Sequence, residues 1–150
     1  MSTRSHYLID LPSTSFSSDT RLEGVLPGSA KRLRLHVERF ARYFLREMRF
    51  GGIQFEAAET PDTAGYVPFK AFLLAAEGRY IGAGCFRNRI EECETIPWVF
   101  DWLWLHPFCR RRGHLSYVWP ALLAEMGHFR CAKPLSVSME RFLAKMGYGE

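Results

Sequence analysis

Apolar residues recur every three or four positions over residues 29–50, which is the spacing of an amphipathic helix. The repeating positions are Leu33, Val37, Phe40, Phe44 and Met48. Ser29 stands where a helix cap is expected, and Gly51 and Gly52 follow the last apolar position. The pattern therefore predicts one long helix in the first third of the chain.

Apolar and strand-forming residues then gather in two segments. IQFEAA, residues 53–58, is typical of a short strand, and KAFLLAAEGRYIGAGCFR, residues 70–87, of two strands. Glu77 and Gly78 separate the two halves of the second segment, and glycine supplies the positive φ that a hairpin turn needs. We expect a β-hairpin here. HYLID, residues 6–10, can form another short strand.

The segment IPWVFDWLWL, residues 96–105, is apolar at nearly every position. A continuous apolar run of this kind suits a central strand that is covered on both faces better than an exposed one. Asp101 is the exception in the run. The sequence therefore predicts a buried strand that carries one carboxylate.

Helical and strand patterns alternate in the last third of the chain. SYVWPALLAEM, residues 116–126, has helical character, with Pro120 either kinking the helix or marking its first turn. FRCAK, residues 129–133, predicts a short strand, and Ser136 can cap a final helix over residues 137–146. The apolar face of that helix consists of Met139, Phe142, Leu143 and Met146.

This order of elements indicates an α/β or α+β fold, with a mixed sheet flanked by helices and a parallel crossover around residues 96–133. A chain of 150 residues fits one domain. The stretch LPSTSFSSDT is rich in Ser, Thr and Pro, so we assign residues 1–28 to an N-terminal arm with a possible first strand. Residues 29–150 form the expected domain.

Charge and composition exclude few classes of function. A formal net charge of +4 and a pI near 9.0 fit an anionic partner, whether a nucleotide cofactor, a nucleic acid or an acidic protein. No apolar run approaches the roughly 20 residues of a membrane span, and no secretory signal is visible, so the four cysteines are expected to be free thiols. A soluble, cytoplasmic protein is expected.

The segment HPFCRRRGHLS, residues 106–116, leaves the buried strand and opens the next helix. A helix N-terminus presents unpaired N–H groups to an anion, and Gly113 lets the backbone approach it closely. The three consecutive guanidinium groups are those of Arg110, Arg111 and Arg112. One guanidinium group can donate two parallel hydrogen bonds to a phosphate, so we expect this loop to hold a polyphosphate.

The same stretch, LHPFCRRRGHL, resembles the cofactor loop of the GNAT superfamily of acyl-CoA N-acyltransferases, which has the form Arg/Gln-x-x-Gly-x-Gly/Ala. Arg110 and Gly113 fall on the Arg and the first Gly, whereas Leu115 replaces the second Gly or Ala. The hairpin and the ending FLAKMGY extend the resemblance over about residues 29–148. The resemblance implies a GNAT-like sheet that is shortened at the C-terminus, where most members have two further strands. The N-terminal arm or a second subunit, as in a homodimer, would then complete the acceptor pocket.

The resemblance also implies direct transfer of an acyl group from acetyl-CoA, or a related acyl-CoA, to an amine on a small molecule, a protein or an aminoacyl-tRNA. The pantetheine arm would lie along the buried strand and the pyrophosphate on the backbone of the loop. The cofactor-binding residues that follow from it are Leu103, Leu105, Arg110, Arg111, Arg112, Gly113, His114 and Leu115.

Two residues are candidates for the catalytic proton transfers. Asp101 lies in the strand that carries a carboxylate in several family members, and its aromatic neighbours are expected to raise its pKa toward that of a general base. Pairing with an arginine or capping is the equally weighted alternative for Asp101. Leu143 stands where many members have a tyrosine acid, which leaves Tyr148 as the substitute, with Ser136 also near in sequence. A degenerate protein that binds CoA without turnover is a further alternative.

The sequence also contains residues suited to two other kinds of site. The pairs formed by His106 with Cys109 and His128 with Cys131 have zinc-like spacing, but a helix between them would separate them by about 17 Å. No metal site is therefore predicted. The basic residues of the first helix, with only Glu38 and Glu47 against them, fit a solvated face or a contact with nucleic acid. They are Lys31, Arg32, Arg34, Arg39, Arg42, Arg46 and Arg49.

Overall fold

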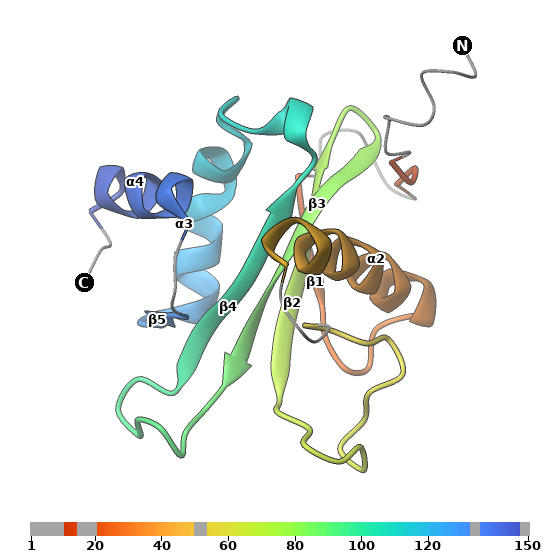
Figure 1. The fold of residues 1–150 in the computed structure, drawn as a ribbon, viewed down its shortest axis with the longest axis vertical. Helices are drawn as coiled ribbons and strands as arrows, with labels where there is room; N and C mark the ends of the chain where they lie inside the picture. The colour runs from red at the N-terminus through yellow and green to blue at the C-terminus, as the bar shows by residue number, and fades with distance from the viewer. Residues whose placement is uncertain (1–10, 15–20, 50–53, 133–135, 148–150) are drawn as a thin grey trace.

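A computed structural model describes residues 11–14, 21–49, 54–132 and 136–147 (Figure 1). Its elements in chain order are β1 (Leu22–Val25), α2 (Lys31–Met48), β2 (Phe69–Ala76), β3 (Arg79–Asn88), β4 (Trp98–Leu105), η1 (Pro107–Cys109), α3 (His114–Met126), β5 (Arg130–Cys131) and α4 (Val137–Lys145). The strand expected over residues 6–10, the helix stop at Gly51 and Gly52, and Tyr148 lie outside the described residues.

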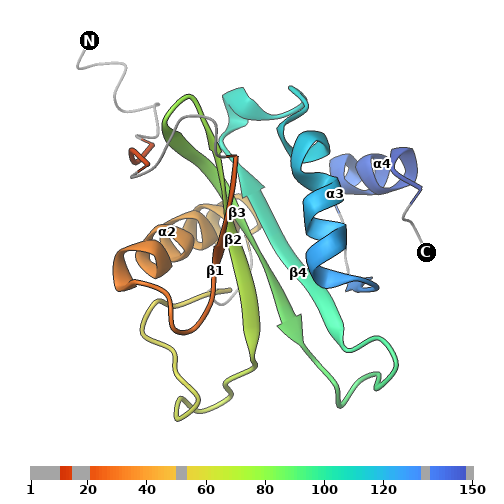
Figure 2. The ribbon, with the colours of Figure 1, turned by 180° about the vertical axis from the view of Figure 1, so that it is seen from behind.

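The five strands form one sheet in the order β1-β2-β3-β4-β5. Neighbouring strands are antiparallel except β4 and β5, which are parallel, so the predicted mixed sheet and its parallel crossover are confirmed. Helix α2 covers one face of the sheet, and α3 and α4 lie on the other face (Figures 1 and 2). The strand β1, which pairs with β2, was not predicted at its residues.

The hairpin of β2 and β3 is confirmed. Its turn consists of Glu77 with φ 53° and Gly78 with φ 77°. Positive φ at both central residues matches the right-handed twist of the flanking strands, which favours a two-residue connection. The chain that leaves β4 stays next to β3, because the N–H of His106 donates to the carbonyl of Ile81 at 2.8 Å.

Helix α2 confirms the helical pattern, with Leu33, Val37 and Phe40 buried against the sheet. The expected cap at Ser29 is wrong, because the N-cap is Ala30 and it makes no side-chain hydrogen bond. The hydroxyl of Ser29 instead accepts a hydrogen bond of 2.8 Å from the N–H of Leu26 and closes the turn before the helix.

The strand expected over residues 53–58 is wrong, since residues 54–58 form bends and turns. The cause is the buried guanidinium of Arg87, which donates to the carbonyl of Gln54 at 3.0 Å and pairs with Glu59 at 2.7 Å. Phe55 enters the core beside Phe69, with ring centroids 4.9 Å apart. The segment wraps around a paired cation and does not join the sheet.

The last third of the chain follows its pattern closely. Helix α3 begins two residues earlier than expected and keeps Pro120 in its interior. The hydroxyl of Ser136 accepts a hydrogen bond of 3.1 Å from the N–H of Met139, which confirms the predicted cap of α4. Leu143 is only 2% exposed and packs with α3 and the sheet. Among the described helices, none is long and apolar enough to cross a membrane.

Candidate functional site

A β-bulge interrupts β4 at Asp101. Trp102 lies opposite Cys85 of β3 and Phe100 lies opposite Phe86, so Asp101 is an extra residue without a partner in the ladder. A bulge reverses the alternation of side chains along a strand. As a result Trp102 packs on the α2 face and Phe100 on the α3 face, although both belong to the same strand.

Beyond this bulge β4 loses its other neighbour. The parallel strand β5 pairs with β4 at two positions, and the second of them joins Phe100 to Cys131. One further hydrogen bond runs from the N–H of Ala132 to the carbonyl of Phe100, at 3.0 Å. Strand β4 continues to Leu105, so within the described structure its last five residues have no strand on that side.

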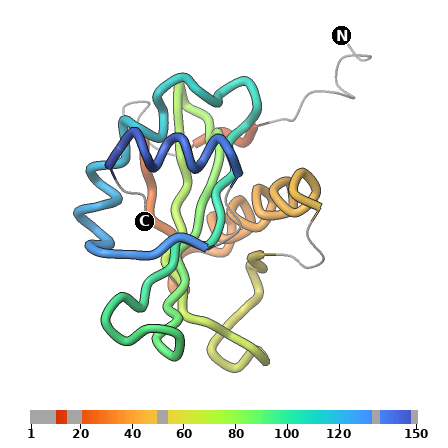
Figure 3. The backbone as a smooth tube through the Cα atoms, turned by 60° about the vertical axis from the view of Figure 1, so that its left-hand side comes forward, coloured from red at the N-terminus to blue at the C-terminus, as the bar shows by residue number. Residues whose placement is uncertain are grey.

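A cavity of about 520 Å³ occupies this gap, a volume within the usual range for ligand sites. Its walls include Asp101, Leu103 and Leu105 of β4, the end of α2 and the apolar face of α4. Helix α4 lies in front of the sheet near the end of β4 that leads into η1 (Figure 3). The structure thus brings the residues expected to take the pantetheine arm to one elongated cavity.

A second cavity of about 320 Å³ lies next to the first, because Arg111, Leu115 and other residues line both. Gly113 and His114 line the second cavity. Arg112 belongs to neither set of lining residues, and its Nε donates to the carbonyl of Phe108 at 2.6 Å. Of the residues expected to bind the cofactor, only Arg112 therefore lies away from both cavities.

Two residues in left-handed conformations shape the loop between η1 and α3. Arg111 and Gly113 adopt left-handed conformations, with φ 61° and φ 84°. The first hydrogen bond inside α3 runs from the N–H of Tyr117 to the carbonyl of Gly113, so the N–H groups of residues 114–116 have no backbone acceptor in the described part of the chain. Outside Gly113 and its two chain neighbours, no described atom lies within 4 Å of where a Cβ on Gly113 would stand. The free N–H groups and this open space fit a bound phosphate.

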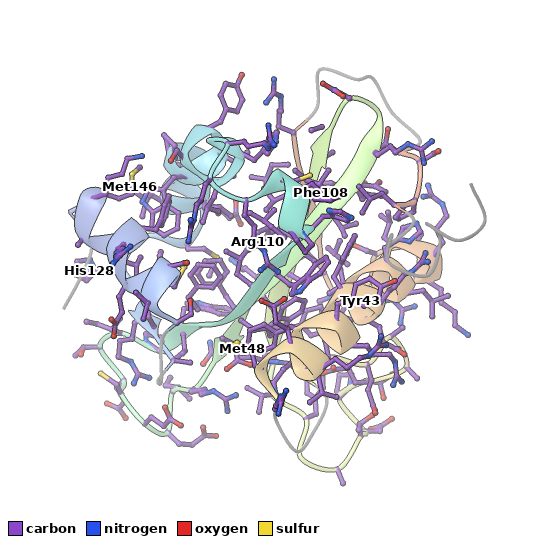
Figure 4. The ribbon with its side chains drawn as sticks, turned by 45° about the horizontal axis from the view of Figure 1, so that its top comes forward. Tyr43, Met48, Phe108, Arg110, His128 and Met146 are labelled. Atoms are coloured by element: carbon purple, nitrogen blue, oxygen red, sulfur yellow. The ribbon has the colours of Figure 1, made fainter. Side chains whose placement is uncertain are left out.

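Arg110 holds the loop to the end of α2. Its two terminal nitrogens donate to the two carboxylate oxygens of Glu47 at 2.8 and 2.7 Å, and its Nε donates to the carbonyl of Leu105 at 2.8 Å. Figure 4 shows Arg110 between η1, which carries Phe108, and the C-terminal end of α2 at Met48. The guanidinium of the motif arginine is therefore occupied by protein contacts. Its partner Glu47 was not identified from the sequence, because the two residues are 63 positions apart.

The ion pair between Arg110 and Glu47 predicts that the free energy of unfolding depends on pH. The hydrogen bonds from Arg110 hold the pKa of Glu47 below its ordinary value of 4.5, and the indole N–H of Trp104 adds to this effect. The stabilisation is complete above the ordinary pKa and is lost as the pH falls through the lowered one. We expect Glu47→Gln to lower the free energy of unfolding by about 1 kcal/mol at neutral pH.

Denaturant unfolding across the acid range measures this effect. The difference between the parent and the Gln variant should vanish at the most acidic pH that the fold tolerates. The matched control is Glu38→Gln, which removes another α2 carboxylate, one whose partners are Arg42 at 2.9 Å and the N–H of Ala57 at 2.8 Å. A constant difference at every pH would show that Glu47 stabilises the protein by packing alone.

Asp101 lines the first cavity and also forms an ion pair. Its Oδ1 lies 3.4 Å from a terminal nitrogen of Arg89, and the two side chains are 12% and 31% exposed. The predicted alternative, pairing with an arginine, is thus a real contact. The same contact holds the carboxylate at the bulge, where Asp101 lines the first cavity.

Two buried ring nitrogens near the cavities have no hydrogen-bond partner among the described residues: Nε1 of Trp102 and Nδ1 of His114. Burial lowers the pKa of His114, and the nearby Arg21 and Arg112 lower it further. His114 lines the second cavity and Trp102 the first. Unpaired buried nitrogens are costly, so both are unfavourable for the stability of this region.

The basic side chains of α2 largely have partners within the protein. Besides the pair between Arg42 and Glu38, Arg34 donates to the carbonyls of Ser29 and Ala57. The Nε of Arg39 donates to the hydroxyl of Tyr43 at 3.0 Å. Of these contacts only the pair with Glu38 is with a charged partner, so the face remains basic.

The described residues contain no group of three or more His, Cys, Asp or Glu side chains that could hold a metal ion. The Nδ1 of His106, one of the four residues with zinc-like spacing, accepts a hydrogen bond of 3.1 Å from the N–H of Phe108. The side chain of His106 therefore caps η1.

No family model matches the sequence, and no curated protein matches it. Among solved structures, the chain is similar to an aminoglycoside acetyltransferase from an uncultured soil metagenomic sample, determined in complex with sisomicin. The two share 13% sequence identity with a TM-score of 0.54, over 85% of this chain and 84% of the other. The likeness supports a GNAT-like fold for this chain.

Proposed function

We propose that the protein is an N-acyltransferase that takes an acyl group, acetyl in the simplest case, from acyl-CoA and delivers it to an amine. One observation carries the proposal: the gap between β4 and β5 opens beside the free N–H groups at the start of α3. A thioester arm and a polyphosphate head can therefore be bound at the same time. The open space beside Gly113 fits such a ligand.

The residues of this chain have distinct parts in the proposed reaction. The bound thioester supplies the activated acyl group. Backbone N–H groups of residues 114–116 hold the pyrophosphate, and Leu103 and Leu105 line the path of the arm. Asp101 accepts the proton that the amine loses as its nitrogen bonds to the acyl carbon and the carbon–sulfur bond breaks. Asp101 stands in the bulge, where it lines the cavity.

The departing thiolate gains a proton at the end of the reaction, and the donor of this proton has to be assigned. Leu143, at the position where a tyrosine is common in the resembling family, is buried and has no proton to donate. We assign the role to Tyr148 or to water, with the thiolate also able to leave unassisted near neutral pH. A protein that binds CoA without turnover is the second candidate, and the buried Leu143 is the observation that favours it.

Binding and turnover are tested separately. We expect native mass spectrometry of the purified protein with acetyl-CoA to show a one-to-one complex, and calorimetry to give its affinity. Release of the CoA thiol is then followed with a panel of amines. Aminoglycosides come first because the similar solved structure holds sisomicin, and other small amines, peptides and aminoacyl-tRNA follow. Binding with no thiol release on the whole panel would favour the degenerate protein, and no binding would refute both.

A further inference from the structure

The second cavity has an unusual charge. Three basic side chains line it, Arg111 from the loop and Arg141 and Lys145 from α4, and no acidic side chain is among its described lining residues. None of the three makes an ion pair or a side-chain hydrogen bond in the described part of the protein. Unpaired cations around one concave site attract a concentrated negative charge.

The cations of α4 form a regular stripe. Ser138, Arg141, Phe142 and Lys145 line the cavity at spacings of three, four and seven residues, which places them on one side of the helix. Phe142 continues into the first cavity, while Arg141 and Lys145 line only the second. The two charges thus line the part of the second cavity that the first does not share, together with Gly113, His114 and Ser116.

This arrangement offers contacts to two anionic groups of one ligand. Arg111 and Leu115 line both cavities, so the N–H groups at the start of α3 lie near the junction, where they fit a pyrophosphate. Arg141 and Lys145 are left for a second anion farther along the ligand. A phosphate monoester carries a charge of about −1.5 to −2 at neutral pH, which two cations match.

We propose that the second cavity binds a 3′-phosphorylated adenosine, so that Arg141 and Lys145 make the protein select CoA thioesters over their 3′-dephospho forms. The inference rests on the proposed function, since the thioester arm must lie in the first cavity for the nucleotide to reach the second. Arg141 and Lys145 are then specificity-determining residues for the cofactor.

Calorimetry with CoA and with 3′-dephospho-CoA tests the inference. We expect the parent protein to bind CoA about tenfold more tightly or better, because charge-assisted contacts to the 3′-phosphate are present only there. In the double variant Arg141→Gln with Lys145→Gln, the affinity for CoA should fall to that for dephospho-CoA, which itself should stay unchanged. Lys31→Gln, an exposed charge on α2 across the sheet, should leave the preference intact.

The other outcomes are distinct. Equal affinities of the parent for the two ligands, or an equal loss for both in the double variant, would overturn the inference and place the α4 cations on the pyrophosphate or in solvent. Binding of neither ligand would overturn the proposed function itself. A preference for CoA that depends on Arg141 and Lys145, without acyl transfer to any amine, would uphold the inference and refute only the transferase activity.

Discussion

Replacing Gly113 by leucine should weaken acyl-CoA binding by at least about 100-fold, since one or two charge-assisted hydrogen bonds from the loop are lost. Outside residues 112–114, no described atom lies within 4 Å of a Cβ at this position, and that free space adjoins the N–H groups at the start of α3. A leucine would occupy the space that a phosphate needs. At φ 84° it would also strain the loop. Calorimetry with CoA measures the loss.

A second glycine serves as the control that separates the effect of backbone strain from the loss of the anion site. Gly65 has φ 75° and equally open surroundings, but it lies in the loop before β2 and lines neither cavity. Both variants should lose about 1 kcal/mol of stability through the left-handed conformation. Gly65→Leu should still bind CoA like the parent. An unchanged CoA affinity in Gly113→Leu would remove the main support for the transferase.

Elements whose signals are local could be predicted from the sequence. The Glu77 and Gly78 turn, the apolar spacing of α2 and the Ser136 cap each depend on residues a few positions apart, and all three are confirmed. Residues 53–58 carry strand-forming side chains, but their backbone is organised by Arg87, about 30 positions away. A periodic pattern contains no information on such a contact.

The candidate site shows the same limit. The loop could be predicted as the connection between a strand and a helix, because a strand pattern, a glycine and a helix start follow one another in the sequence. The role of Arg110 depends on Glu47, which lies on another helix, so the pattern could not distinguish a phosphate ligand from a structural anchor. The bulge at Asp101 depends on the register with β3. The cations of α4 can be recognised as part of a site only when the fold places them beside the loop.

We expect Asp101→Asn to lower turnover by about 10² to 10⁴ with little change in CoA affinity, the usual range for a lost general base. Asparagine keeps the size of the side chain in the bulge and removes its ability to accept the proton of the amine. Steady-state thiol release gives the turnover, and calorimetry gives the affinity. Tyr148→Phe should have a much smaller effect, because the thiolate can leave without an acid.

The ion pair with Arg89 provides the decisive control for this variant. Arg89→Gln breaks the same 3.4 Å contact but leaves the carboxylate in place. If Asp101 only stabilises the bulge through its partner, the two variants should lose turnover and stability to a similar extent. If Asp101 is the base, Asp101→Asn should lose turnover far beyond Arg89→Gln, while denaturant unfolding shows comparable stabilities. Normal turnover in Asp101→Asn would assign the proton to solvent or to another group and leave Asp101 a purely structural residue.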